Sequence, residues 1–190
     1  MPETLEPKVK ETLRAYVRDV KTLHNEANKT ARFAALIGEL FPDAVAQYSR
    51  DVEKLIRIDQ TAGQKKGRAD AYYGNAIIEF EKSLSATLED AKRQLREYVA
   101  GVWQKENRES LRPLLAVASD GIRWIRFRPI LPDGEEPTPE TVALDELQDF
   151  KVTDETLGEF WLWLSSLLFR PQQVEATAEQ FQFEFGSLSF

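Results

Sequence analysis

The stretch from residue 67 to residue 98 most constrains the fold, because two short apolar segments flank Gly74-Asn75 and a long amphipathic segment follows them. A Gly-Asn pair between segments rich in Ala, Tyr, Ile and Phe is typical of a β-hairpin with a two-residue turn. In such a turn Tyr73 pairs with Ala76. Counting outward along both strands then places Asp70 opposite Glu79.

The same hairpin predicts a cluster of carboxylates. Side chains alternate across a strand, so Glu81 shares a sheet face with Glu79 and Asp70. Like charges opposed across strands destabilise a sheet by about 0.2–1 kcal/mol per pair. A divalent cation, which prefers oxygen ligands, would compensate them. The alternative is the solvated acidic face of an edge hairpin, but these strands carry apolar residues on both faces, which is typical of covered strands.

Three short motifs in this stretch resemble those of the PD-(D/E)xK nuclease superfamily. Gly67-Arg68-Ala69-Asp70 is similar to its GxxD signature, and Glu79-Phe80-Glu81 is similar to its (D/E)xK element. Gln94-Leu95-Arg96-Glu97-Tyr98 is similar to the QxxxY motif of the RecB-like branch. The amino-acid sequence of this stretch also resembles that of the N-terminal nuclease domains of large restriction-modification proteins. The resemblance covers residues 20–130 and implies an α/β (α+β) fold, a restriction-endonuclease-like mixed β-sheet flanked by helices.

The resemblance implies a Mg²⁺-dependent DNA endonuclease, with Mn²⁺ as an alternative ion. Asp70 and Glu79 would be the metal ligands, and the metal would activate water and neutralise the scissile phosphate. The chain departs from the pattern at Glu81, where the family usually has Lys; the nearest lysine, Lys82, is predicted on the opposite face. Glu81 would then orient or deprotonate the water or hold a second metal. The alternative is an inactive module of the same fold that binds DNA or a partner subunit.

The resemblance assigns roles to residues on two predicted helices. Glu26 would be the upstream acidic residue that supports a metal-bound water, although an acid at a helix N-terminus also stabilises the helix dipole. Glu39 competes for that role. Gln94 and Tyr98 are i, i+4 neighbours that would position the substrate or the catalytic carboxylates, the alternative being an exposed Gln beside a core Tyr.

Charge is divided unevenly along the chain, whose net charge is −7. Residues 1–130 hold 23 Lys and Arg against 19 Asp and Glu, whereas residues 131–190 hold 2 against 13. The basic part contains the candidate site, and cations there would bind phosphates, which dominate non-specific DNA affinity. The predicted DNA-binding residues are Lys65, Lys66, Arg68, Lys82 and Lys92. The acidic part is either a solvated face or a surface for a basic neighbour.

Hydrophobic spacing predicts the remaining elements. Helices are expected over 3–23, 26–41, 83–103 and 154–169. In the second helix, the residues expected to suit close packing are Ala27, Ala31, Ala34, Ala35, Leu36 and Leu40. Strands are expected over 53–59, 113–119 and 122–129, the last two joined by a turn at Asp120-Gly121. Residues 60–68 and 132–141 are expected to be loops.

Length and composition predict one domain. The resemblance implies that this domain is nuclease-like and covers 1–170, with 171–190 as a tail or the start of a linker. The chain has no cysteine, which excludes disulfides and thiolate chemistry. It has neither a long apolar run nor an apolar N-terminus, so a cytoplasmic protein without a membrane contact is expected. Methyltransferase or specificity domains would follow residue 190, and a homo-oligomer is an open alternative.

Overall fold

The computed structural model describes residues 5–42, 71–73, 75–105, 111 and 113–169. Two helices come first, α1 (Pro7–Val20) and α2 (Glu26–Leu40), followed by the strands β1 (Ala71–Tyr73) and β2 (Ala76–Phe80). Helix α4 (Leu84–Trp103) then leads to β3 (Leu115–Ser119), β4 (Arg123–Ile130) and β5 (Ala143–Lys151), and α5 (Leu157–Phe169) ends the described part. The chain is therefore a mixed α/β protein, as the sequence predicts.

The strands form one five-stranded sheet in the order β1-β2-β3-β4-β5. The pair β2/β3 is parallel and the other three pairs are antiparallel, which makes the sheet mixed. Parallel neighbours need a crossover connection, and α4 supplies it between β2 and β3. In the first hairpin Tyr73 pairs with Ala76, so the predicted register is confirmed over the three described pairs.

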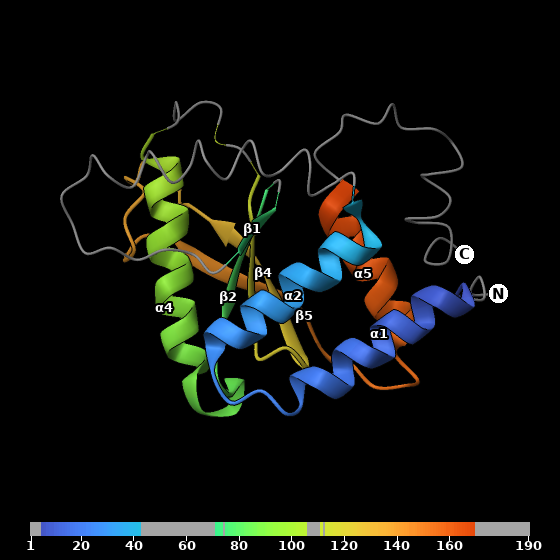
Figure 1. Cartoon of the computed structure of the whole chain (residues 1–190). Coiled ribbons are helices and arrows are strands. Elements are labelled where there is room, and N and C mark those ends of the chain that lie inside the picture. The colour runs from blue at the N-terminus through green and yellow to red at the C-terminus, as the bar shows by residue number, and fades with distance from the viewer. Residues whose placement is uncertain (1–4, 43–70, 74, 106–110, 112, 170–190) are drawn as a thin grey trace, which may run out of the picture.

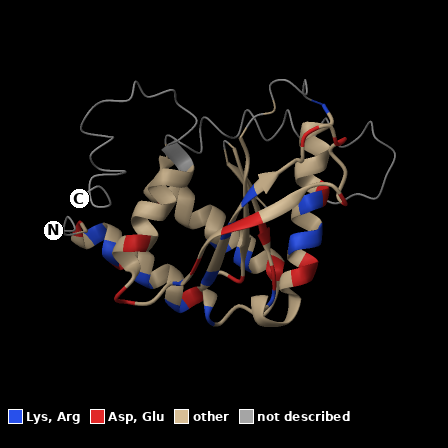
Figure 2. Ribbon diagram, turned by 180° about the vertical axis from the view of Figure 1, so that it is seen from behind, with Lys and Arg blue, Asp and Glu red and all other residues tan. Residues whose placement is uncertain are grey.

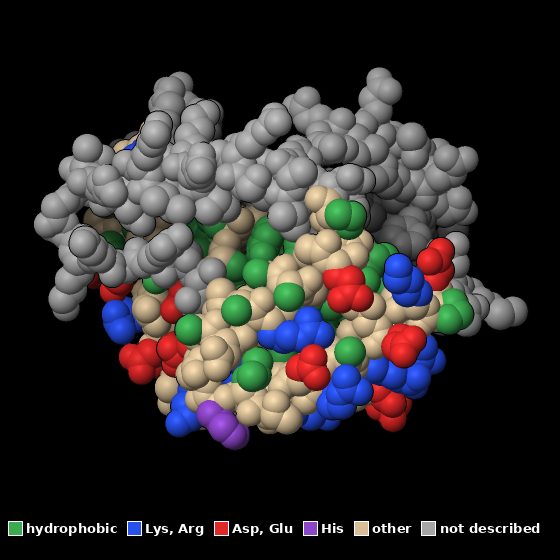
Figure 3. All heavy atoms as spheres, in the orientation of Figure 1, with side chains coloured by type: hydrophobic (Ala, Val, Ile, Leu, Met, Phe, Trp, Pro, Cys, Tyr) green, Lys and Arg blue, Asp and Glu red, His purple; other side chains and the backbone are tan. Residues whose placement is uncertain are grey.

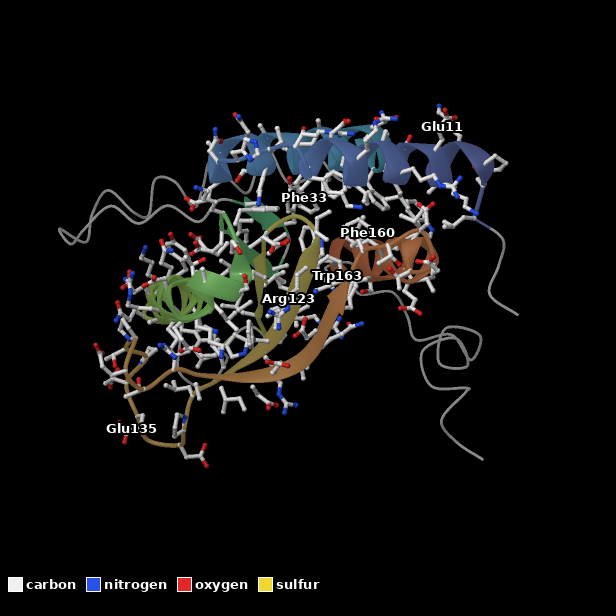
Figure 4. The ribbon with its side chains drawn as sticks, turned by 90° about the horizontal axis from the view of Figure 1, so that it is seen from below. Glu11, Phe33, Arg123, Glu135, Phe160 and Trp163 are labelled. Atoms are coloured by element: carbon white, nitrogen blue, oxygen red, sulfur yellow. The ribbon has the colours of Figure 1, made fainter. Side chains whose placement is uncertain are left out.

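The helices cover the sheet unequally (Figure 1). On one face, residues of α1, α2 and α5 pack against Ala76, Ile78 and Phe80 of β2 and against Trp124 of β4. We call this the aromatic face. Phe33, Phe160 and Trp163 converge there from two helices (Figure 4), and the Trp124 ring lies 5.1–5.5 Å from each of theirs. This cluster is the larger part of the hydrophobic core.

The opposite face of the sheet is covered by α4, and we call it the α4 face. Leu84, Ala91, Leu95 and Val99 of this helix are fully buried. Their cluster includes Ile77, Ala116, Ala118, Ile125 and Phe127 from the strands. The apolar stripe expected over 83–103 is thus confirmed as the packing surface of α4.

Two details differ from the sequence predictions. Of the residues expected to pack closely in α2, Leu36 is buried and Leu40 is half-buried, whereas Ala27, Ala31, Ala34 and Ala35 are exposed. The helix packs through Phe33, Leu36 and Ile37. Strand β5 was not expected at all. The strand predicted over 53–59, the loop over 60–68 and the tail over 171–190 lie outside the described residues.

Candidate functional site

Two buried glutamates lie on the α4 face, at the carboxyl end of β2. Glu79 is 6% exposed and Glu81 is 5% exposed. Glu79 pairs across the sheet with Ala118, which belongs to the core of this face, and the Glu81 N–H donates to Ser119 O at 2.8 Å. Burying a carboxylate costs several kcal/mol unless other groups compensate its charge. The predicted common face of the two glutamates is therefore confirmed, and both are withdrawn from water.

Helix α4 contributes an amide to one of these carboxylates. The Gln94 Nε2 atom donates to Glu81 Oε1 at 3.4 Å, from 13 residues further along the chain. Tyr98, one turn beyond Gln94, is half-buried and packs against the core of the α4 face. The structure thus brings Gln94 to the predicted carboxylate and places Tyr98 beside the core.

A third charged group reaches this end of β2 from the other side of the sheet. Lys29 of α2 is 5% exposed, and its Nζ lies 2.8 Å from Lys82 O and 3.4 Å from Glu81 O. Burial lowers the pKa of Lys29, while the negative charges of Asp120 and Glu26 raise it. The sequence prediction missed this lysine. Its burial could have been predicted from its spacing, because Lys29 precedes Phe33, Leu36 and Ile37 at the helical interval of an apolar stripe.

Asp120 organises the loop that closes the same end of the sheet. One of its carboxylate oxygens accepts from the backbone N–H groups of Ile122 and Arg123, and the other accepts from Leu84 N at 3.3 Å. The side chain therefore ties the β3–β4 turn to the first residue of α4. Residues from α2, β2, α4 and the β3–β4 turn meet here because the carboxyl ends of parallel strands share one sheet edge.

The two upstream acids are placed differently. Glu26 is the first residue of α2 and is exposed, one helical turn from Lys29, so it lies near the end of β2. Glu39 lies toward the other end of α2, about 15 Å along the axis from Lys29, where it accepts a hydrogen bond from Thr12 Oγ1 at 2.8 Å. Of the two acids, Glu26 therefore lies nearer the predicted site.

Two predicted DNA contacts can be located. Lys82 is exposed immediately after Glu81. Lys92 lies on α4, where its Nζ is 3.0 Å from Glu89 Oε1 and 5.7 Å from the centre of the Phe127 ring. Both basic and acidic residues lie along α4 (Figure 2), and the face that shows α1 and α2 carries both signs (Figure 3). The described part of that face therefore shows no large field of one sign.

The remaining predicted site residues, Asp70, Lys65, Lys66 and Arg68, lie outside the described residues. Among residues that are described, no three acidic or histidine side chains form a group that could hold a metal ion. The three-carboxylate cluster therefore stays a prediction, with two of its members located.

Comparisons with protein-family models, with curated proteins and with solved structures find no match to this chain. Within the described part of the chain, no helix is long and apolar enough to cross a membrane. The function must therefore be inferred from the site itself.

Proposed function

We propose that this chain is a metal-dependent deoxyribonuclease domain of the PD-(D/E)xK type, which hydrolyses DNA phosphodiester bonds with Mg²⁺ or Mn²⁺. One observation supports it above the others. Glu79 of the central strand β2 and Glu81 just beyond its end are both buried on the α4 face, where a site would lie between sheet and helix. Carboxylate oxygens are the ligands that divalent metals such as Mg²⁺ prefer, and a bound ion would stabilise these buried charges.

The positions of the other motifs support the same proposal. The hairpin register from which Asp70 was predicted to face Glu79 holds over the three pairs before it. Gln94 of the QxxxY-like motif donates to Glu81. In this proposal Asp70 and Glu79 bind the metal, Glu81 orients the attacking water, and Gln94 holds the Glu81 carboxylate in place. A restriction or anti-phage protein would be the wider setting.

The test is nicking of supercoiled plasmid by the purified chain with Mg²⁺, with Mn²⁺ and with a chelator. We expect cleavage with either metal and none with the chelator. Asp70→Ala and Glu79→Gln should abolish it. Glu135→Gln is the matched control, because Glu135 is an exposed loop residue far from the site (Figure 4). The same charge is removed in Glu79→Gln and in this control, so only the position differs.

A wild-type chain that binds DNA without cleaving it under any metal would contradict the enzyme proposal and favour the inactive binding module. The sequence contains no helix-turn-helix or zinc-finger pattern that would read base edges. We therefore expect the binding to lack sequence preference and to weaken steeply with salt. Tight binding to one DNA sequence that does not weaken with salt would contradict both the nuclease proposal and the binding-module alternative.

A further inference from the structure

Lys29 is buried without a carboxylate bonded to it in the described part of the chain. Its two hydrogen bonds go to backbone oxygens, at 2.8 Å to Lys82 and 3.4 Å to Glu81. Lysine is almost never buried without a partner, because an ammonium loses several kcal/mol of hydration. A hydrophobic residue at this position would avoid that cost while continuing the apolar stripe of α2. The lysine must therefore be explained by what its ammonium holds.

The two carbonyls belong to the segment that carries the Glu81 side chain. Beyond Phe80 the β2 strand ends, and the chain turns towards α4 at Ser83. Glu81 is fixed from the β3 side by its N–H bond to Ser119 O. On the other side of the same residue, Lys29 binds its carbonyl and that of the next residue. Backbone at the end of a strand otherwise frays, since no ladder bonds continue it.

We propose that Lys29 is a positioning residue: its ammonium clamps the Glu81–Lys82 backbone to α2 and thereby holds the Glu81 carboxylate against Gln94 on the α4 face. The clamp reaches across the end of β2, from the helix layer on the aromatic face to a residue whose side chain lies on the opposite face. Its effect on cleavage rests on the proposed function, whereas its effect on the backbone does not.

The clamp is tested with Lys29→Met, which keeps an unbranched side chain only one atom shorter and removes the ammonium. Because displacements near 1 Å cost about a hundredfold in rate, plasmid nicking should lose about that factor in kcat while KM for DNA stays constant. Lys29→Arg, which can still donate to both carbonyls, should recover most of the rate. Lys10→Met is the control, because Lys10 is exposed on α1.

A second measurement separates this proposal from the nuclease proposal. Amide hydrogen exchange at Glu81 and Lys82 should accelerate at least tenfold in Lys29→Met, with no change at Phe160 of α5, whether or not the chain cleaves DNA. Wild type that cleaves nothing would overturn the nuclease proposal alone. Unchanged exchange at Glu81 would overturn the clamp, even in a chain that cleaves.

Two other outcomes also overturn the clamp. A rise in KM with unchanged kcat would mean that Lys29 binds DNA directly. A Lys29→Arg variant as slow as Lys29→Met would mean that the site needs the shape of lysine and not its donated bonds. If Lys29→Met does not fold, Lys29→Gln replaces it, since its amide is one bond shorter and should give the same loss of kcat and faster exchange.

Discussion

The two faces of the sheet are both buried, but they are built from different residues. On the aromatic face, Phe33, Trp124, Phe160 and Trp163 fill the space between the sheet and three helices. On the α4 face, small residues such as Ala91, Ala116 and Ala118 lie beside two buried glutamates. Large aromatic side chains bury the most surface and contribute most to stability. We infer from this difference that the aromatic face supplies most of the stability of the fold. The α4 face can therefore carry buried polar groups, which are costly.

The largest effect should follow from a change on the α4 face. If Glu81 serves as a substitute for the usual lysine, Glu81→Ala should reduce plasmid nicking by about a thousandfold or more, the scale on which single catalytic groups act. Glu81→Lys should retain or raise activity, because it restores the residue usual in the family. Rates measured with Mg²⁺ check both.

If the domain is an inactive binding module, Glu81→Ala should change stability and not cleavage. Glu81→Ala should then raise the thermal midpoint, because it relieves repulsion among carboxylates that no metal offsets. An active wild type whose Glu81→Ala variant cleaves at the normal rate would contradict a catalytic role for this residue.

A change on the aromatic face should act on stability. Phe33 is fully buried and its ring centre lies 5.1–6.4 Å from the centres of four other aromatic rings. Phe33→Ala should therefore lower the free energy of unfolding by about 3–5 kcal/mol. Urea unfolding measures it. Leu162→Ala is the control, since Leu162 is 47% exposed and should lose less than about 1 kcal/mol. Similar losses in the two variants would contradict the assignment of the core.

The turn between β3 and β4 should show an intermediate effect. Gly121 has φ +88°, which side chains rarely adopt, and a Cβ there would overlap Val20 Cγ1 of α1. Gly121→Ala should therefore cost about 1–3 kcal/mol. Gly38→Ala is the matched control: Gly38 is exposed in α2 with open space around it, and its replacement should stabilise the helix by about 0.5–1 kcal/mol. Thermal midpoints that shift in the same direction in both variants would contradict these opposite predictions.

The smallest effect belongs to β5. Arg123 donates from Nε and Nη2 to the two carboxylate oxygens of Asp149, and these bonds hold the pKa of Asp149 below its usual range. A depressed folded-state pKa gives stability that is present above the unfolded pKa and is lost as pH falls through the folded one. Asp149→Asn should thus cost at most about 1 kcal/mol at pH 7 and less below about pH 4. A loss as large at pH 3 as at pH 7 would contradict the ion pair as its cause; Asp133→Asn is the exposed control.

The elements with a regular period could be predicted from the sequence. The Gly74-Asn75 hairpin, its register, α4 and the shared face of Glu79 and Glu81 follow from local spacing. The nearness of Gln94 to a carboxylate was expected from the resemblance to the QxxxY motif. These are properties of one continuous stretch. The predictions for Asp70 and for the lysines of residues 60–68 stay predictions.

What could not be predicted depends on pairing between distant segments. In β5 the apolar residues Leu144, Leu147 and Phe150 recur every three positions among acids, which does not match a strand period. Pairing with β4, a register shift at Arg126/Phe127 and bonds from Arg123 and Arg128 impose the strand. Lys29 was missed for the same reason, because its carbonyl partners lie 52 and 53 residues away.

The most direct measurement is an experimental structure of crystals soaked in Mn²⁺, with anomalous scattering recorded for the wild type and for Glu79→Gln. The proposed nuclease site predicts an anomalous peak bound to the carboxylates of Glu79 and Asp70 on the α4 face, and its loss in the variant. A wild-type map without a peak beside Glu79, or a peak that persists unchanged in Glu79→Gln, would contradict a metal-dependent site on that face.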